Sequence, residues 1–274
     1  MTEALAFDDG IEYPTRDGRP VAETPLHYKR LADAAHALFT HYETRPGAYV
    51  GVNMMVYDER GNPRRFLSPD IFVAFGVEDR ERDIYKIWEE RAPSFVLEMT
   101  SKSTRKEDER KMVRYARWGV TEYFLYDPRR EYVKPPLRAF ELVRGTYRAM
   151  RPVTLSNRER GIPSSTLGLE LWLEGSVLRF YDPATGRNLL TPRQAQLRAE
   201  VARLETIAAR SEAIAARSDA DAARSDADAA RSDADAARSD ADVARSEAEA
   251  ANARAAEEAA KRKQLEAELA RLKR

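Results

Sequence analysis

Leu67-Ser68-Pro69-Asp70-Ile71-Phe72-Val73 places one acid, Asp70, at the head of an apolar run, and Phe95-Val96-Leu97-Glu98-Met99-Thr100 places Glu98 inside another. Both runs predict strands. A partly buried carboxylate needs a partner, and two converging carboxylates are a common way for a protein to hold Mg²⁺ or Mn²⁺. The two segments therefore favour a metal-dependent enzyme. The alternative is that Asp70 caps a turn and Glu98 pairs with an arginine, without any site.

The residues after Glu98 predict a helix. Thr104 and Glu107 have the spacing of a capping box, which begins helices. One face of this helix then carries four side chains at helical offsets, Lys111, Arg114, Tyr115 and Trp118. A carboxylate on a strand, a turn and a helix that presents a lysine together form a layout for phosphodiester cleavage. The alternative for Lys111 is an exposed ion pair with Glu107, worth about 0.3 to 0.5 kcal/mol.

Several further motifs follow in one order between Ser68 and Pro128. They are Pro69-Asp70, Trp88-Glu89-Glu90, Val96-Leu97-Glu98, Ser101-Lys102-Ser103-Thr104, Asp108, Lys111, Tyr115, Gly119-Val120 and Glu122-Tyr123-Phe124-Leu125-Tyr126-Asp127-Pro128. This run resembles the Uma2 family, endonucleases of the PD-(D/E)XK, restriction-endonuclease-like superfamily. The resemblance extends from about Pro14, through Asn53-Met54-Met55-Val56-Tyr57, to Tyr181-Asp182-Pro183. It implies an α/β fold with a mixed central sheet flanked by helices, and an enzyme that hydrolyses phosphodiester bonds in nucleic acid, with DNA as the expected substrate.

The resemblance also implies a site. Asp70 and Glu98 match the two acids of the family pattern, and the backbone carbonyl of Met99 becomes a third metal ligand. The usual lysine position, two residues after the second acid, holds Thr100 here. Lys111 matches the lysine that has migrated to the next helix in Uma2 members, and Lys102 is a second candidate. With Mg²⁺ or Mn²⁺ as cofactor, Asp70 and Glu98 would hold the metal and Lys111 would serve the attacking water.

Composition limits the other chemistries. The chain has 274 residues, 46 basic and 46 acidic, and no cysteine, which excludes thiol nucleophiles, cysteine-zinc sites and disulfides. Three histidines in one expected helix, His27, His36 and His41, have spacings that do not make them neighbours on one face, so solvent or core positions are favoured over a metal cluster. No apolar segment is long enough for a bilayer or typical of a secretion signal, so we expect a cytoplasmic protein without a membrane partner.

A basic cluster lies beside the expected site. Between Lys102 and Arg117 the chain carries seven basic residues against three acids. A phosphate backbone could dock there. The candidate contacts are Lys102, Arg105, Lys106 and Arg114. The alternative is a solvated helix face laced with ion pairs.

Periodicity predicts the elements of an α/β domain over residues 1–190. A helix is expected at 24–42 because apolar residues recur at helical offsets. Strands are expected from alternating or continuous apolar runs separated by turn residues. Their ranges are 49–57, 69–75, 94–99, 122–126, 139–143, 146–152 and 169–173.

Residues 197–274 have a different character. The unit Arg-Ser-Asp-Ala-Asp-Ala-Ala begins at Arg217 and recurs at Arg224 and Arg231, a period of seven that is typical of a coiled coil. Its alanines alternate spacings of three and four, and larger apolar residues lie toward both ends of the segment. A long coiled-coil helix that forms a homodimer is therefore expected. Two alternatives to a nuclease stay open: a nuclease-fold module that binds nucleic acid with weak or no cleavage, and a coiled-coil interaction scaffold.

Overall fold

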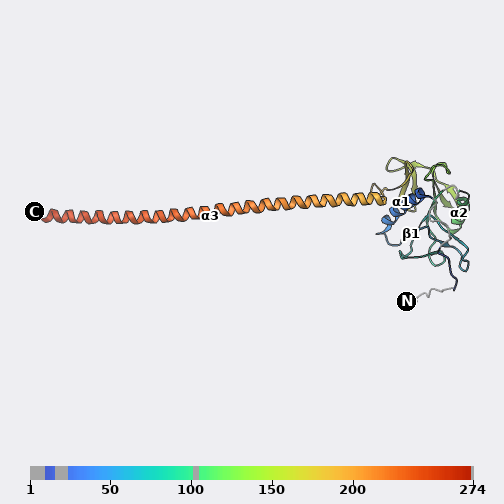
Figure 1. The fold of residues 1–274 in the computed structure, drawn as a ribbon, viewed down its shortest axis with the longest axis horizontal. Coiled ribbons are helices and arrows are strands. Elements are labelled where there is room, and N and C mark those ends of the chain that lie inside the picture. The colour runs from blue at the N-terminus through green and yellow to red at the C-terminus, as the bar shows by residue number, and fades with distance from the viewer. Residues whose placement is uncertain (1–9, 16–23, 101–104, 273–274) are drawn as a thin grey trace. The chain divides into compact units, whose positions relative to one another are not determined.

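The computed structural model describes residues 10–15, 24–100 and 105–272 (Figure 1). By its internal contacts the chain divides into two units, Met1–Arg198 and Ala199–Arg274. Among the described residues, every strand lies in the first unit, and those of the second unit are helical. The expected boundaries of a nuclease domain and a coiled-coil domain stay predictions.

The described elements are three helices and fourteen strands. The helices are α1 (Pro25–Tyr42), α2 (Arg105–Trp118) and α3 (Pro192–Leu272). The strands are β1 (Ala48–Val52), β2 (Val56–Tyr57), β3 (Phe66–Leu67), β4 (Ile71–Phe75), β5 (Tyr85–Lys86), β6 (Phe95–Met99), β7 (Glu122–Tyr126), β8 (Leu137–Val143), β9 (Thr146–Ala149), β10 (Val153–Thr154), β11 (Arg160–Ser164), β12 (Leu169–Glu174), β13 (Val177–Asp182) and β14 (Arg187–Asn188).

A six-stranded mixed sheet is the centre of the first unit. Its strand order is β1-β4-β6-β7-β8-β9. Among these described strands, β6 and β7 pair in parallel and every other neighbouring pair is antiparallel. Parallel neighbours need a crossover connection, and α2 supplies it between β6 and β7. The order of elements therefore places α2 beside the strand that carries Glu98.

The two faces of this sheet pack against different partners. Alternate residues of a strand point to opposite faces. Leu97 and Phe124 belong to a core shared with α1 and with a five-stranded sheet of order β10-β11-β12-β13-β14. Val96 and Tyr123 belong to a second core, which includes Tyr115 of α2. The prediction of a mixed sheet flanked by helices is confirmed, and the five-stranded sheet covers part of one face.

Local sequence explains where α1 and α3 begin. Thr24 caps α1 through its side-chain oxygen, which accepts a hydrogen bond from His27 N at 3.2 Å, and a proline follows at the first helical position. At the start of α3, Thr191 Oγ1 accepts from Gln194 N at 3.4 Å, and Gln194 Oε1 accepts from Thr191 N at 3.1 Å. This reciprocal pair is a capping box. The capping box expected at Thr104 and Glu107 lies outside the described residues.

The prediction of one strand over 49–57 was wrong. Strand β1 ends at Val52, and β2 belongs to a separate three-stranded sheet of order β3-β2-β5. Asn53 lies between them with a φ of 47°, in the left-handed region that interrupts an extended strand. Apart from Asn53 the run has no charged or polar-amide residue, because both strands are buried, so periodicity alone could not show the break.

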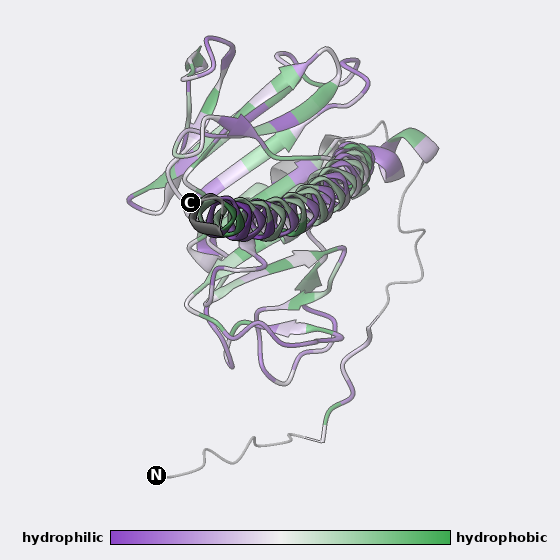
Figure 2. Cartoon of the chain, turned by 90° about the vertical axis from the view of Figure 1, so that its left-hand side faces the viewer, coloured by the Kyte–Doolittle hydropathy of each residue, from purple (hydrophilic) through white to green (hydrophobic). Residues whose placement is uncertain are grey.

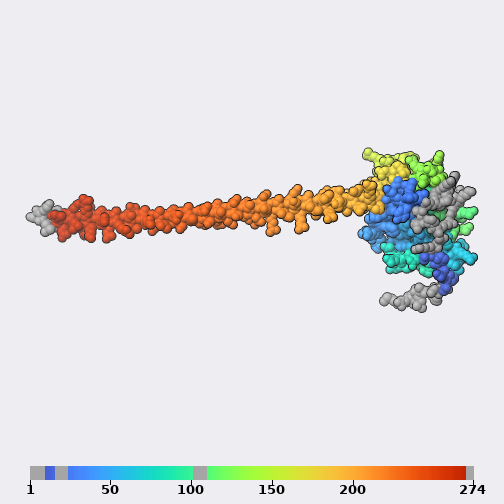
Figure 3. All heavy atoms as spheres, viewed as in Figure 1, coloured from blue at the N-terminus to red at the C-terminus, as the bar shows by residue number. Residues whose placement is uncertain are grey.

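Helix α3 is a continuous helix of 81 residues, about 120 Å long at 1.5 Å per residue (Figure 1). Its residues from 196 to 269 are exposed in the single chain (Figure 3). Figure 2 shows hydrophilic and hydrophobic residues mixed on α3, and hydrophobic segments on several strands of the first unit. None of the helices in the described part of the chain is both long and apolar enough to cross a membrane.

The buried carboxylate of Glu122 connects the two large sheets. Its Oε1 accepts hydrogen bonds from Ser165 N at 2.9 Å and Thr166 N at 3.2 Å, and the Ser164 hydroxyl donates to Oε2. Glu122 begins β7, whereas Ser164 ends β11. This one side chain therefore satisfies several donors at the turn between β11 and β12.

We expect Glu122→Ala to lower the free energy of unfolding by about 3 kcal/mol, because it leaves buried donors without an acceptor. The measurement is urea unfolding followed by tryptophan fluorescence, since all three tryptophans lie in the first unit. Glu141→Ala is the control, because Glu141 pairs with Glu122 across β7 and β8 but is exposed. Equal losses in both variants would contradict the structural role given to Glu122.

Candidate active site

Asp70 and Glu98 meet where β4 and β6 lie side by side. The antiparallel register pairs Ile71 with Leu97, so the preceding Asp70 and the following Glu98 are opposite each other. Both side chains lie on the sheet face that α2 covers, because they alternate with residues of the other core. Two acids far apart in sequence are thus neighbours on one face.

Glu98 is buried and is held by two side chains of α2. Lys111 Nζ donates to Glu98 Oε2 at 2.8 Å, and the Tyr115 hydroxyl donates to Oε1. Lys111 and Tyr115 are one helical turn apart, so they reach the same carboxylate from one face of the helix. Only 2% of Glu98 and 9% of Lys111 is exposed. The pair is therefore a buried ion pair with a third hydrogen-bonding partner.

Burial and charge act in opposite directions on Glu98. Desolvation raises the pKa of its carboxyl, Lys111 lowers it and Asp70 raises it again, with a net pKa of about 7. Desolvation also raises the pKa of the Tyr115 hydroxyl well above its ordinary value, and the Glu98 charge adds to this. Tyr115 therefore acts as a hydrogen-bond donor at neutral pH. The shared influence of Asp70 on both groups shows that the two acids form one electrostatic cluster.

Asp70 is fixed from two directions. Its Oδ2 accepts a hydrogen bond from Met99 N at 2.6 Å, and its backbone oxygen accepts one from Asn53 N at 3.1 Å. Its Oδ1 lies 3.8 Å from Nε2 of His27, a buried side chain in the first turn of α1. The end of β6, the start of β4 and the first turn of α1 therefore meet at this carboxylate.

The structure brings the three expected catalytic residues together. Asp70, Glu98 and Lys111 share one cluster, and the Met99 backbone borders it through its N–H. Lys102 and the side chains of Arg105 and Lys106 lie outside the described part of the chain. Arg114 does not face the two acids in the described structure. Its guanidinium donates to the Phe66 carbonyl oxygen at 2.7 Å and to Asp58 at 3.1 Å.

Two neighbours of the site were not among the predicted site residues. Tyr115 was placed on the correct helix face by its spacing from Lys111, and the apolar surroundings of Glu98 were a signal that its carboxylate needs a second donor. His27 was expected in solvent or core. It is buried as expected, but its proximity to Asp70 depends on how α1 packs, for which the sequence contained no signal.

The two acids offer only part of the ligand set that a divalent metal needs. Within the described residues, no group of three or more histidine, cysteine, aspartate or glutamate side chains is placed to hold an ion. A site here would depend on two carboxylates together with backbone oxygen and water, which suits Mg²⁺ because this ion keeps several waters. Two adjacent acids with a raised Glu98 pKa fit such a cation, which would replace the repulsion between them with attraction.

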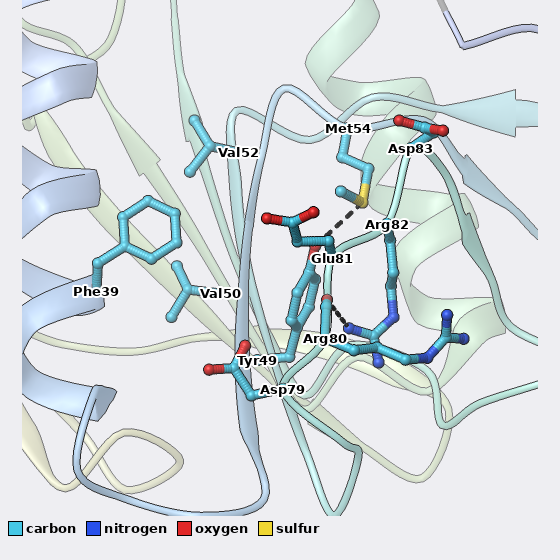
Figure 4. Close-up of a pocket in the computed structure, with 10 residues that line it drawn as sticks. All are labelled: Phe39, Tyr49, Val50, Val52, Met54, Asp79, Arg80, Glu81, Arg82 and Asp83. Carbon is cyan, nitrogen blue, oxygen red and sulfur yellow. Dashed lines mark hydrogen bonds between the residues drawn. The ribbon is translucent and has the colours of Figure 1, made fainter.

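A cavity of about 840 Å³ lies beside β1 and does not include the acids. Figure 4 shows Phe39, Val50 and Val52 on one side of it and the charged segment 79–83 on the other. Arg82 within that segment lies 4.2 Å from the centre of the Tyr49 ring and donates to Glu90 at 2.7 Å. Its charge is thus already paired. The cavity is lined by three acids, Asp79, Glu81 and Asp83, but within the described residues they are not placed together as a metal-holding group.

The raised pKa of Glu98 predicts a pH-dependent effect of Glu98→Gln on stability. Folded Glu98 keeps its proton up to about pH 7, whereas the unfolded chain loses it near 4.5. Between these values the folded state binds more protons, so this group's contribution to stability falls as pH rises. Glutamine does not ionise. We therefore expect the stability of Glu98→Gln relative to wild type to rise from pH 4.5 to 7, by on the order of 3 kcal/mol.

The measurement is urea unfolding in EDTA at several pH values. Glu89→Gln is the control, because Glu89 is 45% exposed and makes only a surface ion pair with Lys86. A stability difference between Glu98→Gln and wild type that stays constant with pH would contradict a raised Glu98 pKa.

Comparisons with known proteins bear on most of the first unit. A family model described as "Uma2: Putative restriction endonuclease" matches residues 2–176. Among solved structures, the chain is similar to a putative nuclease belonging to DUF820 from Anabaena variabilis, with 13% sequence identity and a TM-score of 0.39. That match covers 57% of this chain and 78% of the other. No curated protein matches the chain.

Proposed function

Because the chain belongs to the Uma2 family, whose model is described as a putative restriction endonuclease, we propose that it is a divalent-metal-dependent endonuclease that hydrolyses phosphodiester bonds in DNA. The observation that carries this proposal is the cluster of Asp70, Glu98 and Lys111, with Lys111 Nζ 2.8 Å from Glu98 Oε2. Two acids on one face of a sheet and a lysine from the helix that covers this face suit metal-assisted phosphodiester hydrolysis.

Asp70 and Glu98 would hold Mg²⁺ or Mn²⁺. The carbonyl oxygen of Met99 would be a third ligand, because a residue in a strand directs its N–H and C=O to the same side of the strand. The N–H of Met99 points to Asp70, so its carbonyl is expected on that side. The metal, when bound, would polarise the phosphate and lower the pKa of a bound water.

Each protein group then has a separate task. Met99 N–H fixes the orientation of Asp70, and Tyr115 fixes that of Glu98. Lys111, held by the same carboxylate, would orient the attacking water or offset the negative charge that develops on the phosphate. Because these groups are already positioned by β6 and α2, little reorganisation is needed at the reaction step.

We expect Asp70→Asn, Glu98→Gln and Lys111→Met each to reduce plasmid cleavage by roughly 100-fold or more, because each removes a ligand or a group that stabilises charge. Cleavage of supercoiled plasmid, single-stranded DNA and RNA is measured with Mg²⁺, Mn²⁺ or EDTA. Lys29→Met is the control, because Lys29 is an exposed lysine in α1. Cleavage that survives EDTA, or that all three variants retain, would contradict the proposal.

A nucleic-acid-binding module without cleavage is the second candidate. Thr100 favours it, because this buried residue stands where the superfamily usually has its lysine. Folded wild-type protein that binds DNA but cuts no substrate with either metal would select this candidate.

We also propose that α3 joins two chains into a dimer. Leu265 and Leu269 are each 55% exposed in the single chain. They lie whole heptads after Ala223 and Ala220, so the leucines continue the alanine seam of the repeats. A dimer could bring two sites to the two strands of a duplex. The coiled-coil scaffold remains the alternative if α3 has other partners.

Sedimentation of the full chain should give a dimer, because pairing buries the exposed leucines of the seam. Leu265→Asp combined with Leu269→Asp should shift the mass toward the monomer, because charges at seam positions oppose pairing. Glu266→Gln combined with Glu268→Gln serves as a neighbouring control. A monomeric wild type at micromolar concentration would contradict the dimer.

A further inference from the structure

A hollow of about 300 Å³ is lined by Asn62, Arg64, Arg65, Arg114 and Arg117, which we call the arginine pocket. Arg114 and Arg117 come from α2, and the other three come from the segment between β2 and β3. We propose that this pocket binds backbone phosphates of the nucleic-acid strand that enters the site. This inference rests on the proposed function and names how its substrate is held.

Two of the arginines are fixed by carboxylates. Asp58 accepts from Arg114 at 3.1 Å and lies 3.2 Å from Arg65 Nε, and the Trp118 indole donates to its other oxygen at 2.6 Å. Glu59 accepts from Arg65 at 2.8 Å. Arg114 also donates to the Phe66 carbonyl at 2.7 Å. These bonds hold two cationic groups in place before any ligand arrives.

The other two arginines have charge to offer. Arg64 and Arg117 are exposed, and neither has a carboxylate partner among the described residues. The pocket thus sets four guanidinium groups against the two carboxylates of Asp58 and Glu59. Arginine has a planar fork of donors that matches phosphate oxygens. The pocket combines two guanidinium groups that carboxylates hold in place with two whose charge is not paired within the described part of the chain, an arrangement that favours an anion of this geometry.

The position of the pocket fits a strand that also reaches the acids. Arg114 and Arg117 lie three and six residues after Lys111, about 4.5 and 9 Å further along α2. The carbonyl that Arg114 contacts belongs to Phe66, four residues before Asp70 and therefore within about 14 Å along the chain. Exposed Arg110 lies on the same flank of α2, within about 60° of both arginines.

A nucleic-acid strand is favoured over a small anion by this spacing. Phosphates recur at every nucleotide along a strand. If one phosphate lies at Asp70 and Glu98, the neighbouring phosphates of the same strand can therefore reach Arg114 and Arg117 further along α2. The volume is equal to roughly ten water molecules at ~30 Å³ each, enough for a hydrated phosphate. No base edge is needed for these contacts, so they position the strand without reading its sequence.

The test is fluorescence anisotropy of the full chain with a short labelled duplex in EDTA, which separates binding from cleavage. Arg64→Gln combined with Arg117→Gln removes two charges and leaves the ion pairs that Arg65 and Arg114 make with Asp58 intact. We expect roughly tenfold weaker binding. The slope of log binding constant against log salt concentration, the salt slope, should be smaller in magnitude by about 2, one for each lost phosphate contact. Arg148→Gln combined with Arg151→Gln removes the same charge from exposed positions outside the pocket and should have little effect.

Equal binding and salt slopes in the two double variants would overturn the phosphate pocket. A free-anion site would also overturn it. In that case inorganic phosphate would raise the melting temperature of wild type but not of Arg64→Gln/Arg117→Gln, and duplex affinity would be unchanged. Cleavage in Mg²⁺ is measured in parallel. If wild type cuts DNA but Arg64→Gln/Arg117→Gln binds like Arg148→Gln/Arg151→Gln, only the pocket is contradicted. If Arg64→Gln/Arg117→Gln shows the smaller salt dependence but wild type cuts nothing, only the nuclease is contradicted.

Discussion

The buried carboxylate of Glu98 is the constraint on which the site depends. A desolvated charge must be paired, and α2 supplies the partners, the Lys111 ammonium and the Tyr115 hydroxyl, which both donate to Glu98. This requirement fixes the rotation of α2 over the sheet, because both donors must face β6. The same rotation turns Arg114 and Arg117 toward the segment between β2 and β3. One buried ion pair thus links the position of the acids to that of the arginine pocket.

The arrangement is better suited to binding a cation than to stability alone. Replacing a buried ion pair with apolar residues often leaves the free energy of unfolding unchanged or raises it. Stability alone therefore does not explain why Tyr115 and Asp70 also lie beside the Glu98–Lys111 pair. Here Asp70 adds a second negative charge and raises the pKa of Glu98, which works against the fold. A divalent ion between the acids would relieve that repulsion. The unfavourable repulsion between Asp70 and Glu98 is thus explained by the metal binding proposed for the site.

Much of the fold and of the candidate site could be predicted from the sequence. The features that could not be predicted have physical causes. Strand 122–126 and the pairing of Asp70 with Glu98 on one face follow from apolar runs and their alternation, which depend on local burial. The break at Asn53 and the membership of β2 in another sheet depend on one left-handed residue. The approach of His27 to Asp70 and the pocket at Arg64 and Arg117 join segments far apart in sequence, which no local pattern specifies.

Direct binding of Mn²⁺, followed by electron paramagnetic resonance of the free ion, tests the central claim most directly. The account predicts at least one tight ion per chain in wild type, lost in Asp70→Asn and kept in Asp33→Asn, a partly buried acid of α1 with no contact to Glu98. Tryptophan fluorescence would show that all three proteins are folded. Folded wild type that binds no Mn²⁺, or Asp70→Asn that binds it as tightly, would contradict the metal site.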